Sequence, residues 1–168
     1  MKKNLLNRWF GRSKSASSDV KLREGLTVLI VDDSRTQLFA LEKLLKAEGV
    51  KTVTAENGKQ GILMARHVKP DLILMDIVMP EINGFQATRY LSRQADTGHI
   101  PIIMISGTNQ ESDKTWGLKL GAKDFMKKPV QRDALLQKIS YWTAEVGNKQ
   151  TLAIEHTSGE QRDWVEAG

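Results

Sequence analysis

Five short runs of apolar residues recur along the chain, and each is followed by a segment of helical spacing. The runs lack the polar alternation of a half-exposed strand, which is typical of strands covered on both faces of a sheet. Between them, apolar residues recur at intervals of three or four, as at Leu38, Leu41 and Leu45. The predicted strands occupy residues 26–31, 52–55, 72–75, 101–105 and 124–126.

This order predicts an α/β fold with five parallel strands and five helices. Crossover connections between parallel strands are right-handed, so the helices are expected on both faces of a doubly wound sheet. In open sheets of this kind ligands bind beyond the carboxyl ends of the strands, near the point where the strand order reverses. The residues at those ends are therefore the candidates for function.

Polar side chains follow four of the predicted strands at this edge. They are Asp32 and Asp33 after the first strand, Asp76 after the third, Ser106 after the fourth and Lys128 after the fifth. An aspartate just before a helix can also cap free N–H groups. One aspartate suffices for a cap, so the pair favours a second role.

Three carboxylates within a few Å of one another repel by on the order of 4 kcal/mol per pair. A cation must offset this repulsion, and Mg²⁺ takes carboxylate oxygens while keeping positions for water and phosphate oxygen. A carboxylate in such a place, opposite an ammonium and a hydroxyl, can attack a phosphoryl group and become an acyl phosphate. Lys128 would then neutralise the phosphoryl oxygens, and Ser106 would hydrogen-bond one of them.

Composition excludes several other kinds of site. The 168 residues are 40% hydrophobic, enough for one domain with a core, and include no cysteine. Disulfides and cysteine-ligated metal sites are thereby excluded. The histidines, His67, His99 and His156, fall in no metal-ligand pattern. No stretch has the length of a membrane span or the pattern of a secretion signal, which predicts a cytoplasmic protein.

The net charge of +5 belongs to one end of the chain. Residues 1–24 hold seven Lys or Arg against two acidic residues, and the rest hold 18 of each sign. No nucleic-acid partner is therefore expected. We expect a basic, flexible arm at 1–24, a domain at 25–147 and a polar tail at 148–168. Apolar residues among the basic ones in 1–14 leave open a weak contact with a membrane or an acidic partner.

The motifs at the strand ends resemble those of a known family. The stretches "VDDS", "LMDIVMP" with "NGF" after it, "MISG" and "KKP" come in order and at suitable spacing. Together they resemble the receiver domain of two-component response regulators, over about residues 26–146. The resemblance implies a flavodoxin-like sheet with strand order 2-1-3-4-5.

The resemblance also implies a role for each residue. Asp76 would accept a phosphoryl group from a sensor histidine kinase or a small acyl-phosphate donor. Mg²⁺ would be held by Asp32, Asp33, Asp76 and the backbone carbonyl of Val78. Lys128 would pair with the phosphoryl group, and the bond from Lys128 to Pro129 is usually cis in relatives. Ser106 and Phe125 would be the switch residues, with the fourth helix, fifth strand and fifth helix as the face for a target protein.

More narrowly, the sequence around these motifs resembles chemotaxis-type receivers that control type IV pili and twitching motility. One departure concerns Val78, which is apolar where chemotaxis relatives often carry a polar side chain that orients the hydrolytic water. The lifetime of the phosphate therefore does not follow from the resemblance. Trp116, in the predicted fourth helix, is expected to be partly buried rather than a partner anchor.

Three functions compete at this point. The first is a stand-alone receiver, not an enzyme, that switches its binding to a partner protein on phosphorylation. The second is a phosphatase of the haloacid-dehalogenase kind, which also uses Mg²⁺ and an aspartyl phosphate but places its nucleophile in a D-x-D after the first strand. The third, a degenerate receiver that binds constitutively, is weakened because every phosphorylation residue is present.

Overall fold

A computed structural model describes residues 20–108 and 110–144. The predicted tail at 148–168, most of the predicted arm at 1–24 and the candidate contact at 1–14 lie outside the described residues. The boundaries of the arm and the tail therefore stay predictions.

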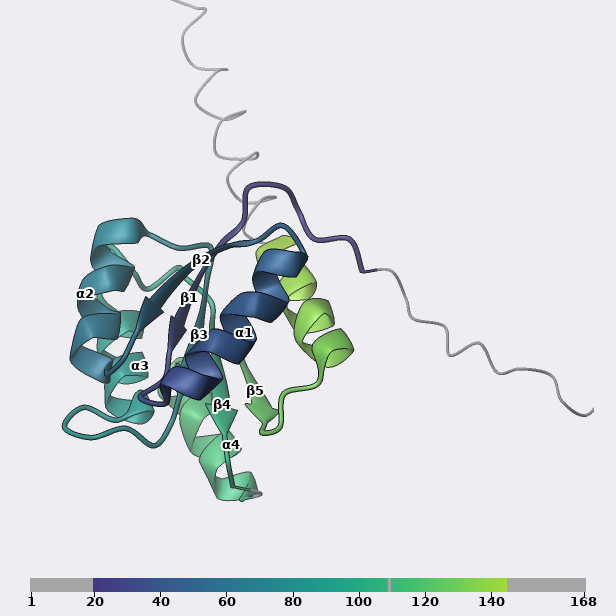
Figure 1. Cartoon of the computed structure of the whole chain (residues 1–168). Helices are drawn as coiled ribbons and strands as arrows, with labels where there is room; N and C mark the ends of the chain where they lie inside the picture. The colour runs from purple at the N-terminus through teal and green to yellow at the C-terminus, as the bar shows by residue number, and fades with distance from the viewer. Residues whose placement is uncertain (1–19, 109, 145–168) are drawn as a thin grey trace, which may run out of the picture.

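Five strands alternate with five helices along the described chain (Figure 1). The strands are β1 (Thr27–Val31), β2 (Lys51–Ala55), β3 (Leu72–Asp76), β4 (Ile102–Ser106) and β5 (Asp124–Lys127). The helices with labels are α1 (Arg35–Ala47), α2 (Gly58–Val68), α3 (Gly84–Arg93) and α4 (Glu111–Lys119). The fifth helix occupies residues 132–144.

All strand pairs are parallel, and the strand order is β2-β1-β3-β4-β5. The predicted doubly wound sheet is therefore confirmed, including its order. Strands β2 and β3 lie on opposite sides of β1, so the strand order reverses between β1 and β3. These two strands are neighbours, with Val31 opposite Met75. The residues that follow them are thereby placed side by side at the carboxyl edge.

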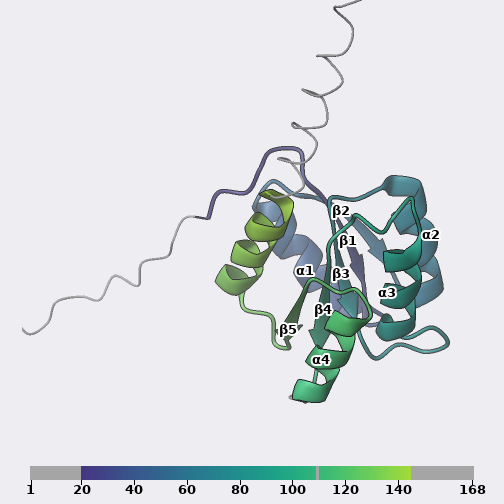
Figure 2. The same ribbon diagram turned by 180° about the vertical axis from the view of Figure 1, so that it is seen from behind.

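The helices cover the two faces of the sheet unequally. Figures 1 and 2 show α1 and the fifth helix on one face and α2, α3 and α4 on the other. The first face buries the alternate strand residues Val28 and Ile30 against Leu41 of α1 and Leu135 of the fifth helix. The second face buries the intervening residues against α2 and α3, because successive side chains of a strand point to opposite sides.

A separate small cluster lies under α4. It consists of Ile77, Met104 and Ala122, with Phe85 and Phe125 packed against it. Gly117 is the only buried residue of α4, and a Cβ there would lie 2.6 Å from Sδ of Met104. Helix α4 therefore approaches the sheet closely through a glycine and contributes little apolar area of its own.

Two local expectations are changed by the structure. The strands β3 and β4 extend one residue further than the apolar runs, so that Asp76 and Ser106 are the last residues of their strands. The prediction that Trp116 is partly buried is wrong, because its side chain is 54% exposed. None of the helices within 20–108 and 110–144 is long and apolar enough to cross a membrane.

Candidate functional site

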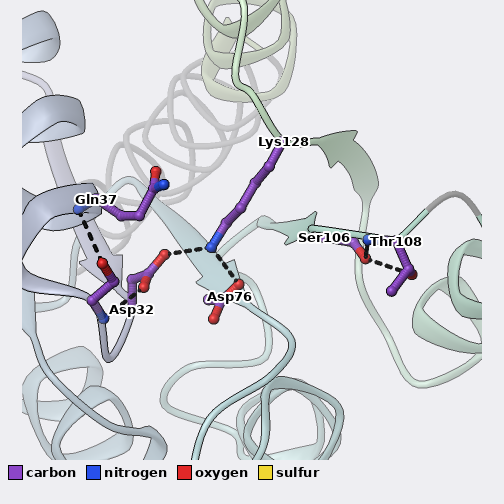
Figure 3. Close-up of polar contacts among 7 residues, drawn as sticks. Asp32, Gln37, Asp76, Ser106, Thr108 and Lys128 are labelled. Atoms are coloured by element: carbon purple, nitrogen blue, oxygen red, sulfur yellow. Dashed lines mark hydrogen bonds and ion pairs between the residues drawn. The ribbon is translucent and has the colours of Figure 1, made fainter.

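The side chains from the ends of β1, β3 and β5 meet at the carboxyl edge of the sheet. The ammonium of Lys128 bridges two of the carboxylates, with its Nζ 2.9 Å from Oδ2 of Asp32 and 2.9 Å from Oδ1 of Asp76 (Figure 3). Asp32 and Asp76 are 1% and 5% exposed, so both charges are almost fully removed from water. The peptide bond from Lys128 to Pro129 is cis.

The structure excludes the reading of the two aspartates as a doubled helix cap. The N-cap of α1 is Ser34, whose Oγ accepts a hydrogen bond from the backbone N–H of Gln37. Asp32 instead accepts the N–H of Ser34 at its Oδ1, 2.8 Å away, while its Oδ2 contacts Lys128. Both oxygens of Asp32 are thus engaged before the helix begins, which fixes the orientation of this carboxylate.

The three carboxylates form a group that fits a divalent cation. Asp32, Asp33 and Asp76 each offer an oxygen, and these oxygens all lie within 4.8 Å of one another. Asp33 is exposed and faces solvent. Three carboxylates and one ammonium leave two negative charges at the edge, and a hard cation with oxygen ligands neutralises such a set best. No other such group occurs in the described part of the chain.

Burial and charge perturb the titration of this cluster. Burial raises the pKa of Asp76, and the charges of Asp32 and Asp33 raise it further, so that it lies above its ordinary value although Lys128 lowers it. Burial lowers the pKa of Lys128, but its hydrogen bonds to Asp32 and Asp76 outweigh this effect, and the pKa lies above its ordinary value. The cluster therefore keeps Lys128 charged and makes the ionised form of Asp76 energetically unfavourable.

The hydroxyl of Ser106 is hydrogen-bonded to Thr108 and not to the carboxylate cluster. Its Oγ accepts the backbone N–H of Thr108 at 3.0 Å and lies 3.0 Å from the Oγ1 of Thr108. Figure 3 shows the Ser106 side chain turned toward Thr108, apart from Lys128 and Asp76. The structure thus brings Asp32, Asp33, Asp76 and Lys128 together but directs the hydroxyl of Ser106 toward the connection between β4 and α4.

The two remaining predicted residues flank the cluster. Phe125 in β5 is half-buried and packs against the small cluster under α4. Val78 lies two residues beyond Asp76, and its side chain is 70% exposed. An exposed valine offers no polar atom from its side chain, so only its backbone carbonyl can act as a metal ligand there.

Three residues near the site escaped the sequence reasoning. They are Ser34, which donates to Asp32; Thr108, which binds Ser106; and Gly84, which begins α3. A Cβ on Gly84 would lie 2.0 Å from the carbonyl oxygen of Asp76, so only glycine allows α3 to start this close to β3. The sequence offered a signal for two of them. Ser and Thr side chains often bond to backbone groups two residues away, which indicates the contact between Ser106 and Thr108. The motif "NGF" contains Gly84.

The fold and this cluster together define a class of phosphorelay signalling proteins. The sequence profile described as "Response regulator receiver domain" matches residues 28–140. The chain belongs to the response regulator receiver family.

Two relatives refine this assignment. The chain is 49% identical over 113 residues to Protein PilH of Pseudomonas aeruginosa, which covers 67% of this chain and 93% of that protein. It is 29% identical over 119 residues to the polar-differentiation response regulator DivK of Brucella anthropi, covering 71% of this chain and 97% of that protein. These relationships do not support the phosphatase reading.

A solved structure supplies a comparison for the metal. The receiver domain of a sensor histidine kinase from Pseudomonas aeruginosa PAO1 carries a magnesium ion coordinated in its active-site cleft. It matches with a TM-score of 0.67 and 28% identity, over 71% of this chain and 98% of that chain. Receiver domains accept phosphate from histidine kinases and act on downstream targets, and they are typically signalling modules rather than enzymes.

Proposed function

We propose that this protein is a phosphorylation switch in which Asp76 accepts the phosphoryl group with Mg²⁺ bound beside it. The observation that carries the proposal is the bridge of Lys128 between Asp32 and Asp76, with Asp33 within reach. The partly exposed ammonium of Lys128, held 2.9 Å from Asp76, lies where the oxygens of a transferred phosphoryl group would need a positive charge.

The residues that would hold the ion are Asp32, Asp33, Asp76 and the backbone carbonyl of Val78. When bound, Mg²⁺ supplies positive charge and an ordered position for a phosphoryl oxygen. Asp32 is fixed by Ser34 and Lys128, so its position is set before any ion arrives. Asp76 supplies the nucleophilic oxygen, and Lys128 stays within reach of the group that it carries.

We also propose the route of the signal. After phosphorylation, Ser106 turns toward the phosphoryl group and the side chain of Phe125 rotates inward. The target protein then binds to the face made of α4, β5 and the fifth helix. The phosphodonor is a sensor histidine kinase, and the similarity to PilH supports a role in type IV pilus twitching motility or chemotaxis. We place the protein in the cytoplasm, where such kinases expose their catalytic domains.

Phosphorylation by a small acyl-phosphate donor tests the central claim. The wild-type protein should take up radiolabelled phosphate in the presence of Mg²⁺, and it should take up none when EDTA is present from the start. Asp76→Asn should take up none. Asp133→Asn is the matched control, because Asp133 is an exposed carboxylate of the fifth helix. Equal labelling of Asp76→Asn and the wild type would remove Asp76 from the proposal.

A further inference from the structure

A chain of three side chains connects the end of β4 to the first turn of α4. Ser106 and Thr108 are joined at 3.0 Å between their hydroxyl oxygens, and the Oγ1 of Thr108 lies 2.5 Å from Oδ2 of Asp113. The backbone N–H of Thr108 also donates to the Oγ of Ser106. We call Ser106, Thr108 and Asp113 the hydroxyl clamp.

The direction of the hydrogen bonds in the clamp follows from a count of hydrogens. An ionised carboxylate carries no hydrogen, so the hydroxyl of Thr108 must donate to Asp113. Thr108 has one hydroxyl hydrogen, and therefore the bond between the two hydroxyls must be donated by Ser106. The single hydroxyl hydrogen of Ser106 is committed to Thr108. Ser106 can donate to an oxygen on Asp76 only after it leaves Thr108.

The other end of the clamp acts on a weakly held helix. The N-cap residue of α4, Gln110, makes no capping hydrogen bond with its side chain. Gly117 is the only residue of α4 that is buried, while Trp116 and Leu118 are 54% and 41% exposed. With so little burial, a short charge-assisted hydrogen bond in the first turn contributes a large share of what holds the start of this helix.

We propose that Thr108 is a positioning residue that holds the hydroxyl of Ser106 away from Asp76 and couples its release to the first turn of α4. The proposal rests on the proposed function and deepens it, because it names the residue that opposes switching in the unphosphorylated state. When Ser106 turns toward a phosphoryl oxygen, Thr108 loses its hydroxyl donor. The bond from Thr108 to Asp113 then no longer ties α4 to the end of β4.

The test measures how tightly the intact chain binds beryllofluoride, a phosphoryl mimic, in the presence of Mg²⁺. Thr108→Val keeps the shape of the side chain and removes the hydroxyl, so the unliganded state loses its clamp. One net hydrogen bond corresponds to an affinity gain of about 2- to 12-fold. Thr108→Ser keeps the hydroxyl and should bind as the wild type does. Thr115→Val is the matched control, because it makes the same change at an exposed position of α4.

A double-mutant cycle separates this role from a general loosening of the fold. In the background of Ser106→Ala, Thr108→Val should leave beryllofluoride affinity unchanged, because there is no hydroxyl left to release. Hydrogen exchange of the amides in the first turn of α4 should be faster in Thr108→Val than in the wild type without beryllofluoride. Asp113→Asn removes the charge of the acceptor. It should raise the beryllofluoride affinity and the rate of hydrogen exchange in the first turn of α4, each by less than Thr108→Val does.

Three results would overturn the clamp. They are unchanged affinity in Thr108→Val, an equal gain with and without Ser106, and a gain of the same size in Thr115→Val. Failure of the wild type to bind beryllofluoride at all would overturn the proposed function, and the clamp with it. Binding by the wild type without a gain in Thr108→Val would overturn the clamp alone.

Discussion

Asp76→Asn should stabilise the protein when no divalent cation is present. At an effective dielectric of about 20, an ammonium 2.9 Å from a carboxylate attracts it by about 5.7 kcal/mol, and a second carboxylate at a distance of no more than 4.8 Å repels it by about 3.5 kcal/mol or more. The remaining attraction, at most about 2 kcal/mol, opposes a desolvation penalty of several kcal/mol for a buried ion. Since Asp33 adds further repulsion, the ionised carboxylate should destabilise the fold by about 1–2 kcal/mol.

The pH dependence of this effect follows from the direction of the pKa shift. Burial raises the pKa of Asp76 in the folded protein, so the folded state holds its proton more tightly than the unfolded state does. The wild type should therefore lose stability as the pH rises from the ordinary pKa of about 3.9 through the raised value. The advantage of Asp76→Asn should be complete above that window and disappear below it.

Urea unfolding in EDTA at pH 7, followed by circular dichroism, measures the difference. A gain of about 1–2 kcal/mol moves the urea midpoint upward by about 0.5–1 M. With Mg²⁺ the difference should shrink or reverse, because the ion stabilises the form that has all three carboxylates. Asp76→Asn less stable than the wild type in EDTA would refute the reasoning.

Substitution of a second aspartate, Asp124, should change the stability of the fold in the opposite direction. Asp124 is a half-buried carboxylate, and it accepts hydrogen bonds from Lys138 at 2.7 Å, Trp142 at 3.0 Å and the N–H of Phe125 at 2.7 Å. Burial raises the pKa of Asp124, but these donors outweigh it, and the pKa lies below its ordinary value. Asp124→Asn should destabilise the fold, and its effect should fade as the pH falls below the ordinary pKa.

Three further outcomes follow from the structure. Mg²⁺ at about 100 times its dissociation constant should stabilise the wild type by about 2.7 kcal/mol. Asp33→Asn should lose most of this gain, as measured by thermal unfolding with and without Mg²⁺. Equal gains in the two proteins would remove Asp33 from the metal site. Gly84→Ala should destabilise by about 1–3 kcal/mol, since the new Cβ would lie 2.0 Å from the carbonyl oxygen of Asp76; Gly107→Ala, where a Cβ meets nothing within 4 Å, is the control in the same unfolding assay. Thr88→Val should stabilise the fold by about 1 kcal/mol, as measured by urea unfolding, because the buried hydroxyl of Thr88 has no hydrogen-bond partner among the described residues. A loss of stability would mean that this hydroxyl does have a hydrogen-bond partner.

The fold could be predicted because its information is local. Apolar runs without alternation indicate buried strands, and the handedness of crossovers leaves few ways to arrange them. The strand ends were less predictable, because the ladder continues through polar residues, with Asp76 opposite Ile105 and Ser106 opposite Lys127. Hydropathy does not record hydrogen bonds of this kind.

The candidate site was predictable in place but not in conformation. Topology alone brings the ends of β1, β3 and β5 to one edge, which is how Lys128 meets an aspartate 96 residues away. The orientation of Ser106 depends on competition between Thr108 and the cluster around Asp76, and a residue pattern does not rank such alternatives. The exposure of Trp116 followed from the close approach of Gly117, which turns the apolar side chains of a short helix outward.

Asp76 occupies the middle strand of the sheet, with two strands on either side of it. Strand β3 is buried along its whole length and has a hydrogen-bonded strand on each side, whereas α4 buries only Gly117. Chemistry that needs fixed atoms and a response that needs movement are therefore assigned to different parts of one small domain. Substitutions in and around α4 can consequently change the sensitivity of the response, or the target protein that it reaches, without disturbing the reacting atoms.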